Sequence, residues 1–255
     1  MPEKFPLVLS SQKKRILLVS DPHQNMERLE YILKKENYDQ VLCLGDWFDS
    51  FDYNTDWHCE NTAAFLKKFI FTENRYTLWG NHDVHYFFDN PTVVCSGYGG
   101  NKQHTIDETL GNFKQPIAER FRWFAWVDDY LCTHAGVHPY HFHPLIKGER
   151  ADVTDFLLTE SNKANADILI NNRNWLYGAG AARGGRLRKG GLTWLDWNYE
   201  FQPIPGINQI VGHTNGRLIR EKHQDNSKNY NIDCDLDYYL IAENGVWTPH
   251  ALKEL

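Results

Sequence analysis

Hydrophobic positions fall into short apolar runs that alternate with longer segments of helical periodicity. Five runs of four to six residues each end at a polar or glycine-containing cluster, which is typical of buried strands. They lie at residues 15–20, 41–44, 76–79, 130–133 and 207–211. Residues 230–251 predict consecutive strands, and Asn244-Gly245 between two apolar runs there predicts a hairpin turn.

Helical periodicity occurs in three segments. In residues 25–35 and 61–71, mostly apolar side chains recur every three or four positions, which predicts two helices. A third helix is expected to begin near Val153. The expected inner stripe of the first helix consists of Met26, Leu29, Ile32 and Leu33. The expected inner stripe of the second helix consists of Ala64, Phe65, Lys68 and Phe69.

The order of these elements indicates the fold class. Strands and helices alternate first, a less regular middle follows, and the end of the chain is rich in strands. This order predicts an α/β fold in which mixed sheets form a sandwich. No internal repeat or low-complexity linker divides the 255 residues, so residues 1–255 are expected to form a single domain.

Composition and charge exclude several classes of protein. A net charge of -6 argues against a basic nucleic-acid or membrane-surface binder, so no stable nucleic-acid partner is expected. No apolar run approaches the roughly 20 residues of a membrane span, and the first residues lack an apolar signal core. The five cysteines are scattered and never form a CxxC pair, which favours free thiols. These features predict a cytoplasmic protein without a membrane partner.

Polar residues of one chemical kind follow each of the five predicted strands. Ligand sites in α/β folds lie at the carboxyl ends of strands, so these residues are expected to meet at one rim. They are Asp21 and His23, Asp46 and Asp49, Asn81 and His82, His134, and His213. Each fragment alone is also compatible with a turn or a helix cap. Together, their oxygen and imidazole groups suit divalent first-row metals.

The five fragments, read in order, resemble a known family. The motifs D-x-H, G-D-x-x-D, G-N-H-D, H-A-G and G-H-T, spread from about residue 15 to residue 233, are similar to those of the calcineurin-like metallophosphoesterases. The H-A-G and V-G-H-T forms are most similar to the branch of serine/threonine protein phosphatases and symmetrical diadenosine tetraphosphate hydrolases. The resemblance implies a calcineurin-like β-sandwich of mixed sheets flanked by helices.

The resemblance also implies a role for each matching residue. The metal ligands would be Asp21, His23, Asp46, Asn81, His134 and His213. Asp46 would bridge two divalent cations, and a metal-bound hydroxide would attack the phosphorus. Mn²⁺ is the expected metal, although Fe, Zn, Co and Ni suit the same ligands. His82 would act as the general acid, and Asp49 would orient it; the alternative for Asp49 is a helix N-cap.

Two departures from the protein phosphatases concern arginines that grip the substrate phosphate. Ser50 occupies the position of the first, and residues 198–212 contain no arginine for the second. A mobile glycine- and arginine-rich loop at residues 178–191 offers Arg183 and Arg186 as substitutes. The alternatives for this loop are a solvated surface segment or an RNA-contacting one.

The remaining residues add smaller expectations. His85 and the neighbouring histidines His138, His141 and His143 are left outside the ligand set and are expected to pack or hydrogen-bond near the rim. Asp233 is expected to give structural support. The tryptophans Trp47, Trp57, Trp194 and Trp197 are expected mostly in the core, with one or two able to stack a nucleobase.

The sequence therefore favours a phosphatase that hydrolyses phosphomonoesters of a phosphoprotein or a small molecule. The alternative is a dinucleoside polyphosphate hydrolase or a phosphodiesterase, because the H-A-G and G-H-T motifs fit both. A phosphate-binding protein on an inactive fold is disfavoured, since all six ligands are present. The physiological substrate, the native metal and the oligomeric state stay open.

Overall fold

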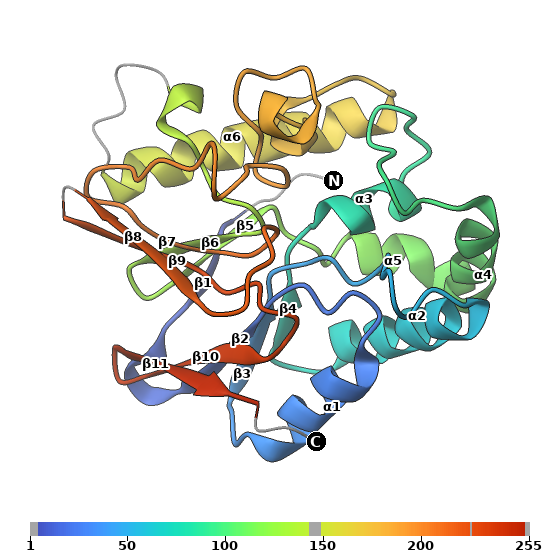
Figure 1. Ribbon diagram of the computed structural model, residues 1–255, viewed down its shortest axis with the longest axis horizontal. Coiled ribbons are helices and arrows are strands. Elements are labelled where there is room, and N and C mark those ends of the chain that lie inside the picture. Colours follow the sequence, from blue (N-terminus) through green and yellow to red (C-terminus); the bar gives the residue numbers. More distant parts are fainter. Residues whose placement is uncertain (1–4, 143–148, 225, 253–255) are drawn as a thin grey trace.

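Two mixed β-sheets with flanking helices form the core of a computed structural model, which describes residues 5–142, 149–224 and 226–252 (Figure 1). One sheet has the order β1 (Leu7–Leu9), β5 (Phe124–Val127), β6 (Tyr130–Thr133), β7 (Asn208–Val211), β9 (Ser227–Asn231), β8 (Arg220–Gln224). The other has the order β11 (Val246–Ala251), β10 (Tyr238–Glu243), β2 (Arg15–Val19), β3 (Gln40–Cys43), β4 (Arg75–Thr77). The α-helices are α1 (Met26–Lys35), α2 (Asp56–Phe71), α3 (Asn81–Phe87), α4 (Gly100–Leu110), α5 (Lys114–Ala118) and α6 (Arg150–Leu169).

The predicted α/β sandwich is confirmed, and strand β2 shows why its sequence is continuously apolar. Ile16 and Leu18 belong to a buried cluster shared with Ala125 and other residues of the opposite sheet. Leu17 and Val19 point the other way, into a core that includes Leu29 of α1. Both faces of the strand are therefore buried, which removes the usual alternation of apolar and polar residues.

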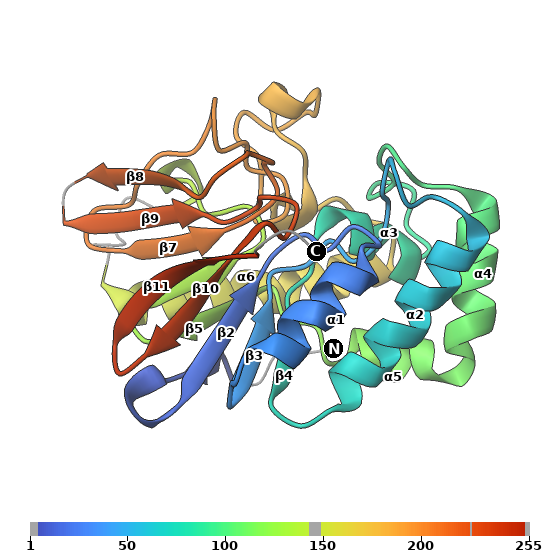
Figure 2. The same ribbon diagram turned by 60° about the horizontal axis from the view of Figure 1, so that its bottom comes forward.

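The helices lie on the outer sides of the two sheets. Figure 2 shows α1 and α2 alongside β3 and β4. On the other sheet, Trp126 of β5 donates from Nε1 to Thr154 of α6 at 3.0 Å, and Trp123 donates to Asn165 of α6 at 2.8 Å. Among the described residues, no helix is both long and apolar enough to cross a membrane.

The five predicted strands and three predicted helices are present, but the inner stripe expected for residues 61–71 is only partly right: Phe69 is buried and Phe65 packs against the core, whereas the other two positions are wrong. Helix α2 begins five residues earlier, at Asp56, with Thr55 as its N-cap. Ala64 and Lys68 are exposed, whereas the buried positions include Ala63 and Leu66. The buried face of α2 is rotated relative to the expected one, because the helix packs against both the sheet and helix α4.

The predicted Asn244-Gly245 turn is confirmed. It joins β10 to β11, in which Glu243 pairs with Val246. Both turn residues have positive φ, 52° and 77°, as the two-residue hairpin turn favoured by Asn-Gly requires.

Candidate metal centre

The ends of five strands converge on one rim and carry all the predicted ligands there. In one sheet β2 and β3 are parallel neighbours, and in the other β6 and β7 are. The carboxyl ends of the two strands in each pair therefore point the same way. The ligands are Asp21 and His23 after β2, Asp46 after β3, Asn81 after β4, His134 after β6 and His213 after β7. Residues 192 positions apart meet here, since the His213 N–H donates to the Asp21 carboxylate at 3.1 Å.

Asp46 lies at the middle of this cluster. Its Oδ2 atom is 3.2 Å from His134 Nε2 and 3.8 Å from His23 Nε2. His134 Nε2 is also 3.1 Å from Asn81 Oδ1 and 4.0 Å from Asp21 Oδ1. A carboxylate in this position can contact two cations through its two oxygens.

The donor atoms form two overlapping groups that could each hold an ion. Asp21, His23 and Asp46 make up one group, and Asp46, His134 and His213 make up the other; within each group the ligand atoms lie within 4.8 Å of one another. Asp46 belongs to both. If both groups held an ion, Asp46 would be the residue that they share.

The chemistry of the histidines fits metal binding. Nδ1 of His23 lies 2.9 Å from the Phe48 carbonyl oxygen, and Nδ1 of His134 lies 2.9 Å from that of Leu44. These carbonyl oxygens can accept a hydrogen bond from Nδ1–H, which leaves Nε2 to bind an ion. His213 Nε2 is buried and has no hydrogen-bond partner in the described part of the chain, so an ion would satisfy it.

The charges around the cluster also favour a cation. Burial lowers the pKa of His134, but the carboxylates of Asp46 and Asp21 more than offset this and raise it to about 10. In the same way the pKa of His23 rises to about 9. Burial and the charge of His134 lower the pKa of His213 instead, which keeps it in the neutral form that binds metals.

The backbone is strained at the site. Positive φ is uncommon outside glycine and gathers where function holds a residue in place. The non-glycine site residues with positive φ are Asp21 (50°), His23 (41°), Asp46 (58°), Asp49 (62°) and His213 (68°). The loops that carry the ligands also approach one another so closely that two positions require glycine. A Cβ atom at Gly80 would overlap the Asp46 carboxylate, and one at Gly212 would overlap Asp21.

His82 lies at the edge of the metal cluster, held by a buried carboxylate. Its Nδ1 is 3.0 Å from Asp49 Oδ2, and its backbone N–H donates to Asp46 Oδ1 at 2.8 Å. Asp49 also accepts from the Tyr86 hydroxyl at 2.6 Å and from Lys102 Nζ at 2.9 Å. Burial raises the pKa of Asp49, but hydrogen bonds led by His82 outweigh this and lower it. Asp49 caps no helix.

The sequence matches the family model of calcineurin-like phosphoesterases over residues 14–216. The chain belongs to this family. A search among curated proteins finds no match. Family membership makes the protein a phosphoester hydrolase, and the grouped donors above are candidates for the metals on which the family depends.

Solved structures of phosphatases have the same fold. A cold-active protein-tyrosine phosphatase of a psychrophilic Shewanella species is similar with a TM-score of 0.57 and 14% identity, over 98% of this chain and 83% of that chain. A serine/threonine phosphatase from Saccharomyces cerevisiae with similarity to human phosphatase PP5 has a TM-score of 0.51 and 14% identity, over 98% and 84%.

A cavity of about 820 Å³ opens over the metal cluster of this phosphoesterase. Arg183 lines it, with Nε 2.7 Å from Asp196 Oδ2 and an Nη2 that donates to Thr214 at 3.0 Å. Arg186 does not reach it. That side chain lines a separate cavity of about 370 Å³ together with Arg173.

The glycine- and arginine-rich segment is anchored, in contrast to the mobile loop expected. The Glu200 carboxylate accepts from the backbone of Ala182 at 3.2 Å and of Gly190 at 2.9 Å. The ion pair of Arg183 with Asp196 adds a third attachment. Arg183 is therefore held at the cavity before any substrate arrives.

Two residues at the site were missed by the sequence analysis. Lys102, at the start of α4, lines the cavity and contacts Asp49. Asp83 is buried and accepts from the backbone N–H groups of Asp46 and Trp47, each at 2.8 Å, and so fixes the loop after β3. Asp83 is the last residue of the G-N-H-D motif, which was its available signal.

Two of the histidines left outside the ligand set, His138 and His141, form hydrogen bonds as expected. His138 Nδ1 accepts from the Tyr140 N–H at 2.8 Å, and His141 Nε2 lies 2.9 Å from the Gly190 carbonyl oxygen. His143 lies outside the described residues. Asp233, expected to be structural, is buried and also lines the cavity.

The tryptophans divide between core and surface. Trp47 and Trp197 are buried, as expected. Trp57 is 64% exposed, so its placement in the core was wrong; it lies at the start of α2 against His58. Trp194 lines the cavity beside His213.

Proposed function

We propose that this protein is a dinuclear-metal-dependent phosphatase that hydrolyses phosphomonoesters of a phosphoprotein or a small molecule. The supporting observation is the cluster of Asp46 with five further donor residues, next to His82 on the cavity. The proposal treats residues 1–255 as one metallophosphoesterase domain. It also places the protein in the cytoplasm, in keeping with five free cysteines.

The metal-binding residues in this proposal are Asp21, His23, Asp46, Asn81, His134 and His213. Mn²⁺ is the proposed metal, and Fe, Zn, Co and Ni suit the same oxygen and imidazole donors. When bound, two cations supply positive charge that polarises the phosphoryl group and activates a water for attack. Asp46 supplies its negative charge between them, since the charges of His134 and His82 hold its pKa well below the usual range against the effect of burial.

His82 is the proposed general acid. Asp49 holds Nδ1, which leaves Nε2 as the nitrogen that gives a proton to the leaving oxygen of the substrate. The ring is 19% exposed and lines the cavity, so a leaving group can reach it. The lowered pKa of Asp49 keeps its carboxylate ionised, so the contact that orients the ring is made to a charged acceptor.

Arg183 and Lys102 are the proposed contacts for the substrate phosphate. Both are basic side chains that line the cavity. Donors aimed at phosphoryl oxygens stabilise the charge that spreads over those oxygens during transfer. The second arginine named from the sequence, Arg186, lies in the other cavity. Only Arg183 of the pair is kept in the substrate-binding role.

The alternative, a dinucleoside polyphosphate hydrolase or a phosphodiesterase, is favoured by two aromatic side chains on the cavity. Phe51 is 94% exposed and lines the cavity, as does Trp194. An exposed aromatic face can stack on a nucleobase. Ser50, in place of a phosphate-gripping arginine, also points away from an ordinary protein phosphatase.

A substrate panel separates these functions. We would measure kcat/KM for p-nitrophenyl phosphate, bis-p-nitrophenyl phosphate, diadenosine tetraphosphate and a phosphopeptide, each with Mn²⁺. The proposal expects the monoesters to be hydrolysed fastest, and Phe51→Ala to leave them nearly unchanged. Preference for the dinucleotide, lost selectively in Phe51→Ala, would replace the proposal with the alternative.

A further inference from the structure

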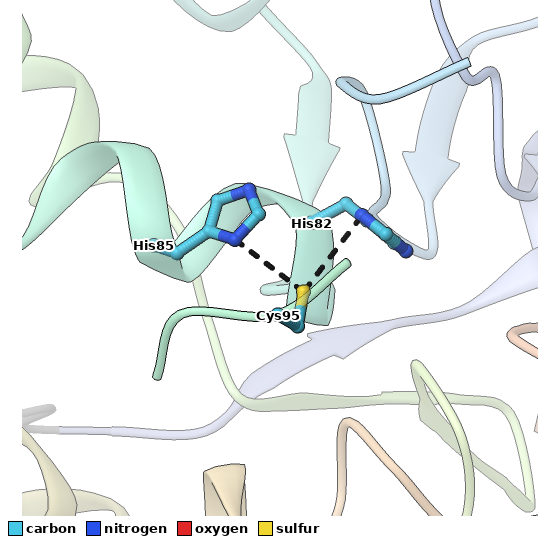
Figure 3. Close-up of side chains that lie close together, drawn as sticks. All are labelled: His82, His85 and Cys95. Carbon is cyan, nitrogen blue, oxygen red and sulfur yellow. Dashed lines mark hydrogen bonds between the residues drawn. The ribbon is translucent and has the colours of Figure 1, made fainter. Parts of the chain in front are cut away.

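A second group of metal-ligating side chains lies directly behind the proposed general acid. His82, His85 and Cys95 point toward one another, with the cysteine arriving from the segment after α3 (Figure 3). Cys95 Sγ is 3.4 Å from His85 Nδ1 and 3.9 Å from His82 Nδ1. Asp49 Oδ2 faces both rings, 3.0 Å from His82 Nδ1 and 2.8 Å from His85 Nε2.

We propose that His82, His85 and Cys95, with a water molecule as the fourth ligand, bind a Zn²⁺ ion that inhibits the enzyme. The inhibitory part rests on the proposed function of His82. The binding part does not, because it follows from the donor atoms alone. None of these three side chains belongs to the set assigned to the two catalytic cations.

The distances suit zinc. Zinc binds sulfur at about 2.3 Å and nitrogen at about 2.0–2.1 Å in a tetrahedron, so a nitrogen and a sulfur ligand of the same ion lie about 3.6 Å apart. The two nitrogen–sulfur distances here, 3.4 and 3.9 Å, fall on either side of that value. Small side-chain rotations would therefore complete the site.

The two ring nitrogens of His85 face different partners. Its side chain is completely buried, and Nε2 lies 2.8 Å from Asp49 Oδ2. Nδ1 faces the Cys95 thiol instead. A carboxylate that holds one ring nitrogen leaves the other to bind an ion, so Nδ1 of His85 is available beside the thiol.

A cation can reach this group from the solvent. His82 and Asp49 line the large cavity, as do Ser96 and Gly97, which follow Cys95 in the chain. Cys95 itself is only partly buried. The thiol would lose its proton to the solvent as the ion binds, as is usual for cysteine ligands.

Sulfur makes the group selective. Thiolate and imidazole favour Zn²⁺, whereas carboxylate, carbonyl and water ligands favour Mg²⁺, Ca²⁺ and Mn²⁺. The proposed catalytic cluster contains no cysteine. The Mn²⁺-loaded enzyme is therefore expected to keep this second group free for zinc.

Zinc at this position would switch off His82. The ion would take Nδ1 and break its contact with Asp49, so the carboxylate would no longer orient the ring toward the leaving oxygen. Transfer of the Nε2 proton would then leave an imidazolate on the ion instead of a neutral imidazole, which disfavours the transfer. Removal of zinc would restore the hydrogen bond and the activity, which makes the inhibition reversible.

The test uses Co²⁺ as a spectroscopic probe of the full-length, Mn²⁺-loaded protein. Binding through Cys95 should produce a thiolate-to-cobalt charge-transfer absorption in the near ultraviolet, and added Zn²⁺ should remove it. Cys95→Ser should abolish the band, while the matched control Cys59→Ala, which changes a buried thiol near Gln24, should keep it. No band in the wild type, or an equal band in Cys95→Ser, would overturn the site.

The inhibitory role needs a second measurement. Zn²⁺ should inhibit the wild type, and Cys95→Ser should keep its basal activity while raising the half-inhibitory Zn²⁺ concentration by at least about tenfold. Equal inhibition of both proteins, relieved by excess Mn²⁺, would place the effect at the catalytic cations and contradict the proposal. Should Cys95→Ser fail to fold, loss of the cobalt band in His85→Gln is the substitute test. The cobalt assay needs no turnover, so it stays informative if the proposed phosphatase function fails.

Discussion

Asp49 Oδ2 lies 3.0 Å from His82 Nδ1, although the two residues are 33 positions apart in the chain. The same carboxylate accepts from Tyr86 and Lys102, so its position is fixed from several sides. His82 also donates its backbone N–H to Asp46. The general acid and the metal cluster are thus joined through two aspartates, and substitutions can separate their roles.

Replacement of His82 by alanine should impair proton donation without loss of metal. We expect kcat on alkyl phosphates to fall by about 10²–10⁴, which is the usual contribution of general acid–base catalysis. The fall should be smaller for p-nitrophenyl phosphate, whose leaving group needs little protonation. An equal loss for both leaving groups would mean that His82 positions the substrate instead.

Asp49→Asn should give a milder form of the same defect. The neutral amide no longer stabilises a protonated His82, so activity should fall by about 10–100-fold, the range found when a supporting partner is removed. Asp52→Asn is the matched control, because Asp52 also lines the cavity yet lies on the exposed surface. Rate constants for the two leaving groups provide the measurement. Equal rates in Asp49→Asn and Asp52→Asn would contradict the orienting role.

The two arginines of the anchored segment should behave differently. Arg183→Ala should raise KM and lower kcat/KM by about one to two powers of ten, since a hydrogen bond to a charged group contributes about 1.5–3 kcal/mol. Arg186→Ala should match the wild type, because Arg186 lies outside the catalytic cavity. Metal content should be unchanged in both. Equal kinetics of Arg183→Ala and the wild type would remove Arg183 from substrate binding.

Metal affinity should rise with pH. Without metal, nearby carboxylates raise the pKa of His23 to about 9 and that of His134 to about 10, so both rings hold protons at neutral pH. A cation must displace these protons, and its affinity should therefore grow as the pH rises toward those values, by about tenfold per pH unit for each proton released. Calorimetric Mn²⁺ titrations in buffers of different ionisation enthalpy would count the protons. A pH-independent affinity would contradict this account.

The convergence of the proposed metal ligands could be predicted from the sequence because each follows its strand directly. The apolar runs predict where strands end, and parallel strands bring those ends to one rim. Strand β5 was missed for a related reason. Its turn into β6 uses Asp128, with a φ of 52°, and Asp129 in place of the glycine or asparagine that marks a hairpin.

The surroundings of Asp49 could not be predicted. Lys102 of α4 contacts Asp49, and Cys95 lies beside its partner His82. Both are placed by the path of the chain between α3 and α4, which has no periodic pattern to reveal it. Arg183 and Arg186 are equivalent in the sequence, yet Gly184 between them has a φ of 72°, and the two side chains line different cavities. The direction in which each arginine side chain points depends on backbone angles and tertiary contacts rather than on local composition.

The most direct test of the account is metal content and activity measured together on the same protein. After prolonged dialysis against a chelator, the wild type should lose its bound metal and its phosphatase activity, and Mn²⁺ should restore both. Asp46→Asn should stay low in metal and nearly inactive after the same addition, because the shared carboxylate is gone, whereas Asp52→Asn should recover. Full activity of the wild type in excess chelator would contradict the central claim.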